Sequence, residues 1–295
     1  MSQALPKNRS KSKSLAPSLL GMPMILLLGI FFAVPLLMVF SFAFRPFDAK
    51  TLIGEGLTLQ NFERFIFDGF YLTAFLRTTL ISLAATALSV VLGFPVAWHL
   101  HNLQSSPLKV WLVLIVLMPL MLSLVIASFA WMIILGSNGV LAGLLSNVTL
   151  LQQPLQFLNT DAGIVIVTVY SFMPYAVLSI YAALENIDPS LSRAARIHGA
   201  NDRQVFLRVT LPLSIPGVVS GALIVFALTM AAFVVPYLIG GGRVKVIPLL
   251  VYNFTIQLFD WPGAAALSLL LFILTLVLTW LLSALGSRLA RWESK

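Results

Sequence analysis

Long apolar segments alternate with short polar connections along this 295-residue chain. Each segment holds about 20 residues or more, which is enough for a helix to cross a bilayer. None of the segments contains Asp or Glu, and only the second contains a basic residue, Arg77. We therefore predict six membrane-spanning helices, over residues 19–44, 74–98, 110–135, 162–183, 213–239 and 264–287.

Helices are the default form of such segments because every backbone polar group in lipid must be satisfied within the segment. Short alternating strands, as in a porin, are not present in the sequence. The predicted fold class is an all-α polytopic membrane protein. Residues 57–70 place Phe62, Phe65 and Ile66 at helical spacing, which predicts a short amphipathic helix outside the spans. That helix either contacts an external partner or packs on its own bundle.

The composition agrees with a membrane protein. Apolar residues make up 59% of the chain and charged residues only 9%, against roughly 25% charged in soluble proteins. The absence of cysteine excludes disulfides, thiolate metal sites and cysteine nucleophiles. A basic tail precedes the first apolar run, as in a signal peptide, but residues 19–44 are too long for a signal and are read as a retained span.

Basic residues predict the orientation of the spans. If the chain begins in the cytoplasm, twelve of the 18 Lys and Arg residues lie on that side, together with both termini. The basic residues behind the net charge of +8 then serve mainly to orient the spans in the membrane, and nucleic acid is not an expected partner. The predicted divisions are a cytoplasmic tail (1–18), a first span with an external segment (19–71), a core membrane domain (72–287) and a cytoplasmic tail (288–295).

The polar loop 184–212, between the fourth and fifth spans, has the clearest local signals. Asp188 is a good N-cap and Pro189 suits the first helical position. Gly199 is a natural C-terminal stop in the left-handed conformation. A second short helix is expected from about Asn201 through Phe206 and Leu207. Two short helices tied to long helices at both ends would form a rigid lever.

The first of these short helices has two faces. Leu191, Ala194 and Ala195 lie on one face, and Arg193 and Arg196 lie elsewhere. Two adjacent alanines allow a close backbone approach to another surface. A knob of this kind can enter a groove on a soluble partner.

The order of Ala-Ala, Gly, an aliphatic residue and Leu-Pro resembles the cytoplasmic EAA loop of type I ABC importer permeases. In that family the loop receives mechanical force from a separate ATPase. The family usually has Glu where this chain has Arg193, so an acid on the partner would have to compensate. The resemblance implies that the ATPase-coupling residues are Leu191, Arg193, Ala194, Ala195, Arg196, Gly199, Leu211 and Pro212.

The resemblance extends from Leu72 to about Leu282. Three later runs, residues 211–217, 233–242 and 260–265, are similar to the spermidine/putrescine permease branch. The family implies two permease chains in the bacterial inner membrane (usually different chains in this branch), an ABC ATPase dimer and an external solute-binding protein. This chain has no phosphate-binding Gly-x-x-x-x-Gly-Lys-Ser/Thr run. We expect it to bind no cofactor, with ATP and Mg on the ATPase.

Carboxylates or aromatic faces would meet a cationic solute in the membrane. The predicted spans contain no acids, so either the second permease supplies them or the solute is less cationic than a polyamine. Packing in the bundle or at the membrane interface is the alternative role for each candidate. The candidate pathway residues are Trp131, Tyr170, Tyr175, Phe233, Tyr237 and Asp260.

Other functions lack the residues they need. His99 and His101 have no further ligands nearby in the sequence, so no metal site is expected. An intramembrane hydrolase would need a polar catalytic set within the spans. An ion-coupled secondary transporter would usually need intramembrane ionisable residues or an inverted repeat. The favoured function is a non-enzymatic permease subunit for a polyamine-like solute; the alternatives are a secondary transporter or an importer of another solute.

Overall fold

The computed structural model describes residues 24, 26–103, 107–137, 139–141, 143 and 156–292, with side chains as far as Arg288. The basic N-terminal tail and most of the C-terminal tail lie outside the described residues. Within this part of the chain every regular element is a helix. The all-α prediction is therefore confirmed.

Four helices are long and apolar enough to cross a membrane without a break. The first predicted span corresponds to a shorter apolar helix, Leu26–Phe42, which includes the π-helical turn η1 (Gly29–Ala33) and α2 (Val34–Phe42). The four long helices are α4 (Gly69–Asn102), α8 (Asp161–Glu185), the continuous run Asp202–Ala231 and α14 (Trp261–Trp292).

The predicted span over residues 110–135 is sharply bent. This segment forms α5 (Pro107–Met121) and α6 (Leu124–Leu135), whose axes differ by 99°. Pro119 lacks the N–H that would continue the backbone ladder in the last turn of α5. Ser123 then adopts extended backbone angles, with ψ at 129°, and the chain turns.

The fifth predicted span, 213–239, is also broken. The helix α11 (Leu211–Ala231) ends at an extended Ala232, and the short helix α12 (Val234–Ile239) follows. A continuous helix would need an N–H from Pro236 to the carbonyl of Ala232, and proline has none. A further helix that the sequence analysis did not anticipate, α13 (Ile247–Ile256), lies between α12 and α14.

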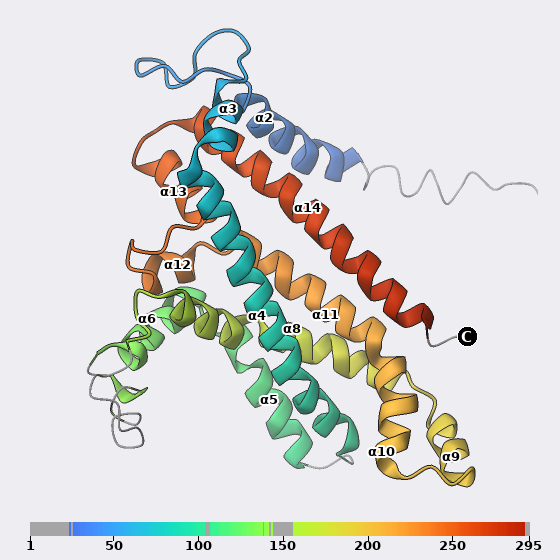
Figure 1. Cartoon of the computed structure of the whole chain (residues 1–295). Helices are drawn as coiled ribbons and strands as arrows, with labels where there is room; N and C mark the ends of the chain where they lie inside the picture. The colour runs from blue at the N-terminus through green and yellow to red at the C-terminus, as the bar shows by residue number, and fades with distance from the viewer. Residues whose placement is uncertain are drawn as a thin grey trace, which may run out of the picture.

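The longest helix, α4, forms the spine of the molecule (Figure 1). It contributes to three buried clusters. Ala74 packs with residues of α3 (Gln60–Phe67), α13 and α14, such as Phe65 and Phe254. Ile81 packs with α6, α8 and α12, and Ala97 packs with the C-terminal half of α8. Because α4 lies in all three clusters, it connects one end of the fold to the other.

Helices α8 and α11 approach each other closely at Gly217. A Cβ added there would meet the side chain of Ala183 and lie 2.8 Å from the backbone oxygen of Ser179. Small residues allow such close helix contacts in membranes, where packing replaces the hydrophobic effect as the driving force. The contact joins the two helices that flank the polar loop.

The predicted amphipathic helix is present as α3 (Gln60–Phe67). Its Phe65 is fully buried and meets Tyr71 edge-on with ring centroids 4.7 Å apart, whereas Ile66 is exposed. The buried face therefore packs on the bundle of the same chain, which was one of the two alternatives predicted for this helix.

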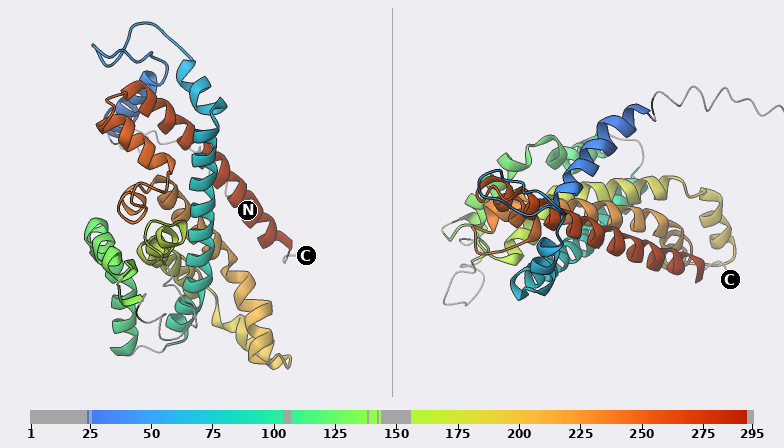
Figure 2. Two further views of the ribbon diagram at one scale, coloured as in Figure 1. Left: turned by 60° about the vertical axis from the view of Figure 1, so that its left-hand side comes forward. Right: turned by 90° about the horizontal axis from the view of Figure 1, so that it is seen from above.

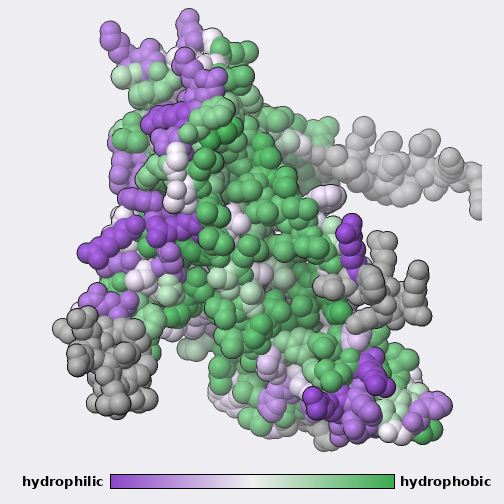
Figure 3. Space-filling view, in the orientation of Figure 1, coloured by the Kyte–Doolittle hydropathy of each residue, from purple (hydrophilic) through white to green (hydrophobic). Residues whose placement is uncertain are grey.

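Polar and apolar surfaces are segregated along the molecule. Helix α3 lies at the opposite end from the helices of the polar loop, α9 (Pro189–Ile197) and α10 (Asp202–Val205), and α4, α11 and α14 run between them (Figures 1 and 2). Hydrophobic surface covers the middle, and hydrophilic residues gather toward the two ends (Figure 3). This distribution fits a bundle that crosses a membrane along its long axis.

Candidate functional site

The polar loop begins with a well-defined helix, α9 (Pro189–Ile197). The Asp188 side chain caps it by accepting a hydrogen bond from the backbone N–H of Ser190 at 2.8 Å. That hydrogen bond, assisted by the charge of Arg193, holds the pKa of the Asp188 carboxyl below its usual value. The sequence prediction of Asp188 as N-cap and Pro189 as first helical residue is confirmed.

The end of α9 is a complete Schellman motif. Gly199 has a φ of +85°, its N–H donates to the carbonyl of Arg196, and the N–H of Ala200 donates to the carbonyl of Ala195. Only glycine adopts this conformation without strain. The predicted left-handed stop at Gly199 is therefore confirmed.

The next helix starts at a reciprocal capping box. Asn201 Oδ1 accepts from the N–H of Gln204, and Gln204 Oε1 accepts from the N–H of Asn201, both at 2.9 Å. Helix α10 (Asp202–Val205) then passes directly into the π-helical turn η2 (Phe206–Thr210) and α11.

The second short helix is thus continuous with the fifth span, contrary to the prediction of a separate element before Pro212. In η2 the N–H of Leu211 reaches back five residues to the carbonyl of Phe206. This wider turn accommodates Pro212 at the start of α11, because a proline ring clashes with the carbonyl that an α-helix would place beside it. A force on α10 would therefore pass straight into α11.

Aromatic contacts attach the loop to the body of the protein. Phe206 packs edge-on against Trp98 and Phe94 of α4, with centroids 4.9 and 6.0 Å apart. The Arg196 guanidinium pairs with Asp202 at 3.0 Å and ties α9 to α10. A cavity of about 520 Å³ separates the loop from the end of α4. Sequence reasoning gave no role to the Phe206 contact, which links elements about a hundred residues apart.

Much of the surface of α9 is exposed. None of its residues is buried, and Leu191 and Ile197 remain 46% and 84% exposed. With Ala194 they form a stripe at a spacing of three residues, which is one face of a helix. Arg193 and Arg196 are also exposed. An exposed apolar stripe held by caps at both ends is typical of a surface that binds a partner.

Five of the six candidate pathway residues are aromatic, and four of them form two groups. Trp131 of α6 meets Tyr170 of α8 edge-on at 5.3 Å. Phe233 stacks on Tyr252 at 5.3 Å, and Tyr237 lies 5.6 Å from the same ring. Trp131 and Tyr252 both pack against the buried cluster around Ile164, Val167 and Val235.

Tyr252 was missed by sequence reasoning because its helix, α13, was not predicted. The fifth aromatic candidate, Tyr175, lies beside Phe172 of its own helix with centroids 6.5 Å apart. Phe233 and Tyr237 are 38% and 46% exposed, so they offer ring surface to a neighbouring molecule.

The sixth candidate, Asp260, has structural partners. It is 6% exposed, accepts the N–H of Gly263 at 2.7 Å and lies 3.7 Å from the guanidinium of Arg64. The Arg64 guanidinium also lies 5.5 Å from the ring of Phe65 and 5.3 Å from that of Phe254. Asp260 therefore caps α14 and anchors α3, which the sequence gave no means to anticipate.

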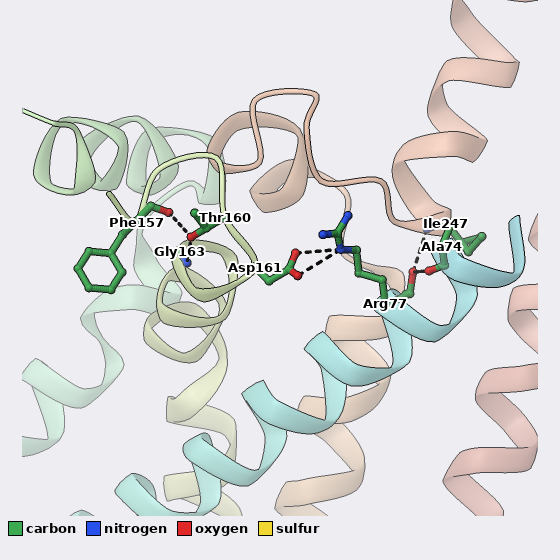
Figure 4. A network of polar contacts seen from close by, with 8 residues as sticks. Ala74, Arg77, Phe157, Thr160, Asp161, Gly163 and Ile247 are labelled. Atoms are coloured by element: carbon green, nitrogen blue, oxygen red, sulfur yellow. Dashed lines mark hydrogen bonds and ion pairs between the residues drawn. The ribbon is translucent and has the colours of Figure 1, made fainter. Parts of the chain in front are cut away.

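The charged residue in the second span also has a partner. Arg77 Nε lies 3.1 and 3.2 Å from the two carboxylate oxygens of Asp161, the first residue of α8 (Figure 4). Next to Arg77, Thr78 Oγ1 accepts the N–H of Ile247 at 2.9 Å (Figure 4). These contacts fasten the start of α4 to α8 and α13, so neither charge is unpaired in the bundle.

The histidine pair lies at the end of α4 nearest the loop. His101 Nδ1 lies 3.3 Å from Glu185, which is also 3.8 Å from Lys109. Among the described residues no group of His, Cys, Asp and Glu could hold a metal ion. The cluster holds α4, α5 and α8 together at the level of the loop.

These features agree with the comparison with known proteins. The family of binding-protein-dependent transport system inner membrane components matches residues 89–291, which include the whole loop and more than half of the chain. The chain belongs to this family. It is therefore a transport subunit and not an enzyme.

Curated relatives and a solved structure agree with the family. The spermidine/putrescine transport system permease PotB of Salmonella typhimurium is 31% identical over 261 residues, 88% of this chain and 90% of the relative. The inner membrane ABC transporter permease YdcU of Escherichia coli is 33% identical over 258 residues, 83% and 82%. A bacterial ABC transporter that imports alginate has a chain with a TM-score of 0.70 at 21% identity, covering 93% of this chain and 95% of that one. This likeness confirms the ABC importer permease fold.

Proposed function

We propose that this family member transmits force from an ABC ATPase dimer through α9. The observation that carries the proposal is the exposed stripe of Leu191, Ala194 and Ile197 on a helix that is capped at both ends. The Arg196–Asp202 ion pair ties this helix to α10, which is continuous with α11 and is packed on α4 through Phe206. A partner that moves α9 would therefore move two helices of the membrane domain together.

Within this proposal each predicted coupling residue has a distinct place. Leu191, Ala194 and Ala195 contact the ATPase, and Gly199 fixes the angle between α9 and α10. Arg196 holds that angle through Asp202. Leu211 and Pro212 begin the helix that receives the movement.

Arg193 would then face the ATPase as a positive charge. It is exposed, and its charge acts on Asp188, the N-cap of the same helix. A carboxylate on the ATPase would complement Arg193 better than a basic residue.

The assembly we propose contains this chain, a second permease, the ATPase dimer and an external solute-binding protein in a bacterial inner membrane. Residues 1–18, the loop 184–212 and residues 288–295 lie in the cytoplasm, and 19–71 and 72–287 form the first span with its external segment and the core domain. ATP and Mg bind to the ATPase, and this chain binds no cofactor of its own.

The proposed solute is a small organic cation of the polyamine type. The likeness to the spermidine/putrescine permease PotB supports this solute. The exposed rings of Phe233 and Tyr237 could hold a cation by cation–π attraction. The acids at the span ends do not favour a cationic solute, because Asp161 and Asp260 already have Arg77 and Arg64 as partners. The second permease would then supply the carboxylates, or the solute is another organic molecule.

Copurification and uptake test the two parts of this proposal separately. The tagged chain is extracted mildly from native membranes, and its partners are identified by mass spectrometry. Recovery of an ATPase and a second permease supports the coupling role, and recovery of the chain alone contradicts it. Uptake of labelled spermidine and putrescine by membrane vesicles then tests the solute, with a neutral sugar as control.

A further inference from the structure

A small internal cavity lies beside the break between α11 and α12. Its volume of about 10 Å³ is at the lower limit of what one water molecule needs. Four elements and the segment before α13 meet around it. The wall is formed by Thr78, Ile81, Ser82, Ile164, Thr168, Thr229, Ala232, Pro236 and Val246.

Ser82 is the unusual member of this wall. It is fully buried, and its Oγ has no hydrogen-bond partner among the described residues. Burying a hydroxyl without a partner costs free energy, so such groups are normally bonded to protein or to ordered water. The Ser82 hydroxyl borders a space that could hold that water.

The wall of the same cavity contains hydrogen-bond acceptors. Thr78 Oγ1 donates to the carbonyl of Ala74 and accepts from Ile247, and Thr229 Oγ1 donates to the carbonyl of Val225. Each hydroxyl oxygen has two acceptor positions, so both threonines retain capacity to accept. The carbonyl of Ala232 also lacks its helical donor, because Pro236 has no N–H.

We propose that this cavity binds one ordered water molecule. The water accepts the Ser82 hydroxyl proton and donates to the oxygens of the threonines or to the Ala232 carbonyl. Water fits better than a metal cation because the wall holds no carboxylate. The bridge would fasten the break in the fifth span to α4, and so hold Phe233 and Tyr237 in position.

A high-resolution map of the assembled transporter tests the proposal directly. We expect one density peak in the cavity at roughly 2.6–3.2 Å from Ser82 Oγ, the range of ordinary hydrogen bonds. An empty cavity, with Ser82 turned to a carbonyl of its own helix, would overturn the proposal. A peak that disappears when sodium is replaced by potassium would also overturn it, because the ligand would then be an ion.

A pair of variants gives an independent test. Ser89 is a matched control: it lies on the same helix, is fully buried and also lacks a partner, but it does not border this cavity. Ser89→Ala removes an unsatisfied hydroxyl, so the Tm of the transporter should stay the same or rise. Ser82→Ala removes a partner of the water and should lower the Tm by about 2–4 °C.

Equal shifts in Tm for the two variants would contradict the proposal. If Ser82→Ala fails to assemble, the map of the unmodified transporter still decides the question.

Discussion

The polar loop and the break between α11 and α12 both redirect the chain, but they do so in different ways. In the loop, each change of direction is made by residues close in sequence: Asp188 caps the helix and Gly199 ends it. At the break, Ala232 is extended, no side chain caps α12, and the surroundings come from α4, α8 and the segment before α13. A locally encoded turn leaves its outer surface free for a partner. A turn encoded by packing depends on contacts with distant parts of the chain.

The largest effect expected in the loop follows from a bulky residue at Gly199. Gly199→Trp should abolish solute uptake while leaving membrane insertion intact. A Cβ at this position meets nothing within 4 Å, so the fold has room for it. The substitution strains the left-handed backbone by roughly 1–2 kcal/mol and places a large ring at the proposed ATPase contact.

Uptake by cells and recovery of the chain in the membrane fraction are the measurements. Gly199→Ala is the control, because it introduces the backbone strain without the bulk, and it should retain part of the activity. Normal uptake by Gly199→Trp would count against the role of the loop as a lever.

The next largest effect concerns the packing that supports the loop. Gly217→Val should lower the stability of the transporter by about 1–3 kcal/mol or more, as overpacking does, because even a Cβ there meets Ala183 and Ser179. Thermal unfolding measures the effect. Ile224→Val on the same helix, at an exposed position, is the control and should have little effect. Equal stabilities of the two variants would show that α8 and α11 are not in close contact.

A smaller and more specific effect is expected at the contact between the loop and α4. Phe206→Ala removes two aromatic contacts, each worth about 0.5–1.5 kcal/mol. The ATPase should still copurify, but uptake per ATP hydrolysed should fall several-fold because α10 is less firmly attached. Leu207→Ala changes an adjacent exposed residue and is the control. Loss of ATPase binding in Phe206→Ala would instead place that ring in the ATPase interface.

The smallest effect is the pH dependence of the cap of α9. The pKa of Asp188 is lowered in the folded chain. The stability that its cap gives to α9 is therefore fully present above the ordinary pKa of 3.8, and it is lost as the pH falls through the lower pKa of the folded chain. The protection of the α9 amides against hydrogen exchange, relative to their intrinsic rate at each pH, should therefore fall below about pH 4. Asp188→Asn keeps a capping oxygen and should remove this pH dependence. The same loss of protection in Asp188→Asn would assign the effect to another group.

This contrast also explains which features the sequence predicted. The caps of the loop depend on residues at fixed short spacings, so Asp188 and Gly199 were identified correctly. The continuity of α10 with α11 was not, because it depends on the π-helical turn before Pro212. The bend at Ser123 comes after Pro119, and the break at Ala232 comes before Pro236. Both prolines lie inside apolar runs, and apolar runs alone do not show which prolines interrupt a helix.

The candidate pathway residues show the same limit. Aromatic residues could be selected by type, but Tyr252 emerged only when packing brought α13 beside α12. Asp260 was selected for its charge. Only the fold shows that its carboxylate already pairs with Arg64 and accepts the backbone N–H of Gly263. Long-range partners of this kind have no signature in a single sequence.

Site-directed cross-linking from α9 tests the central claim most directly. The chain contains no cysteine, so Ala194→Cys places a single thiol on the exposed face. Leu57→Cys, 87% exposed and near α3, is the control. With a photoreactive thiol reagent in membranes that carry out uptake, the account predicts an adduct between Ala194→Cys and an ATPase and none from Leu57→Cys. Absence of an ATPase adduct at Ala194→Cys, or equal adducts at both positions, would contradict it.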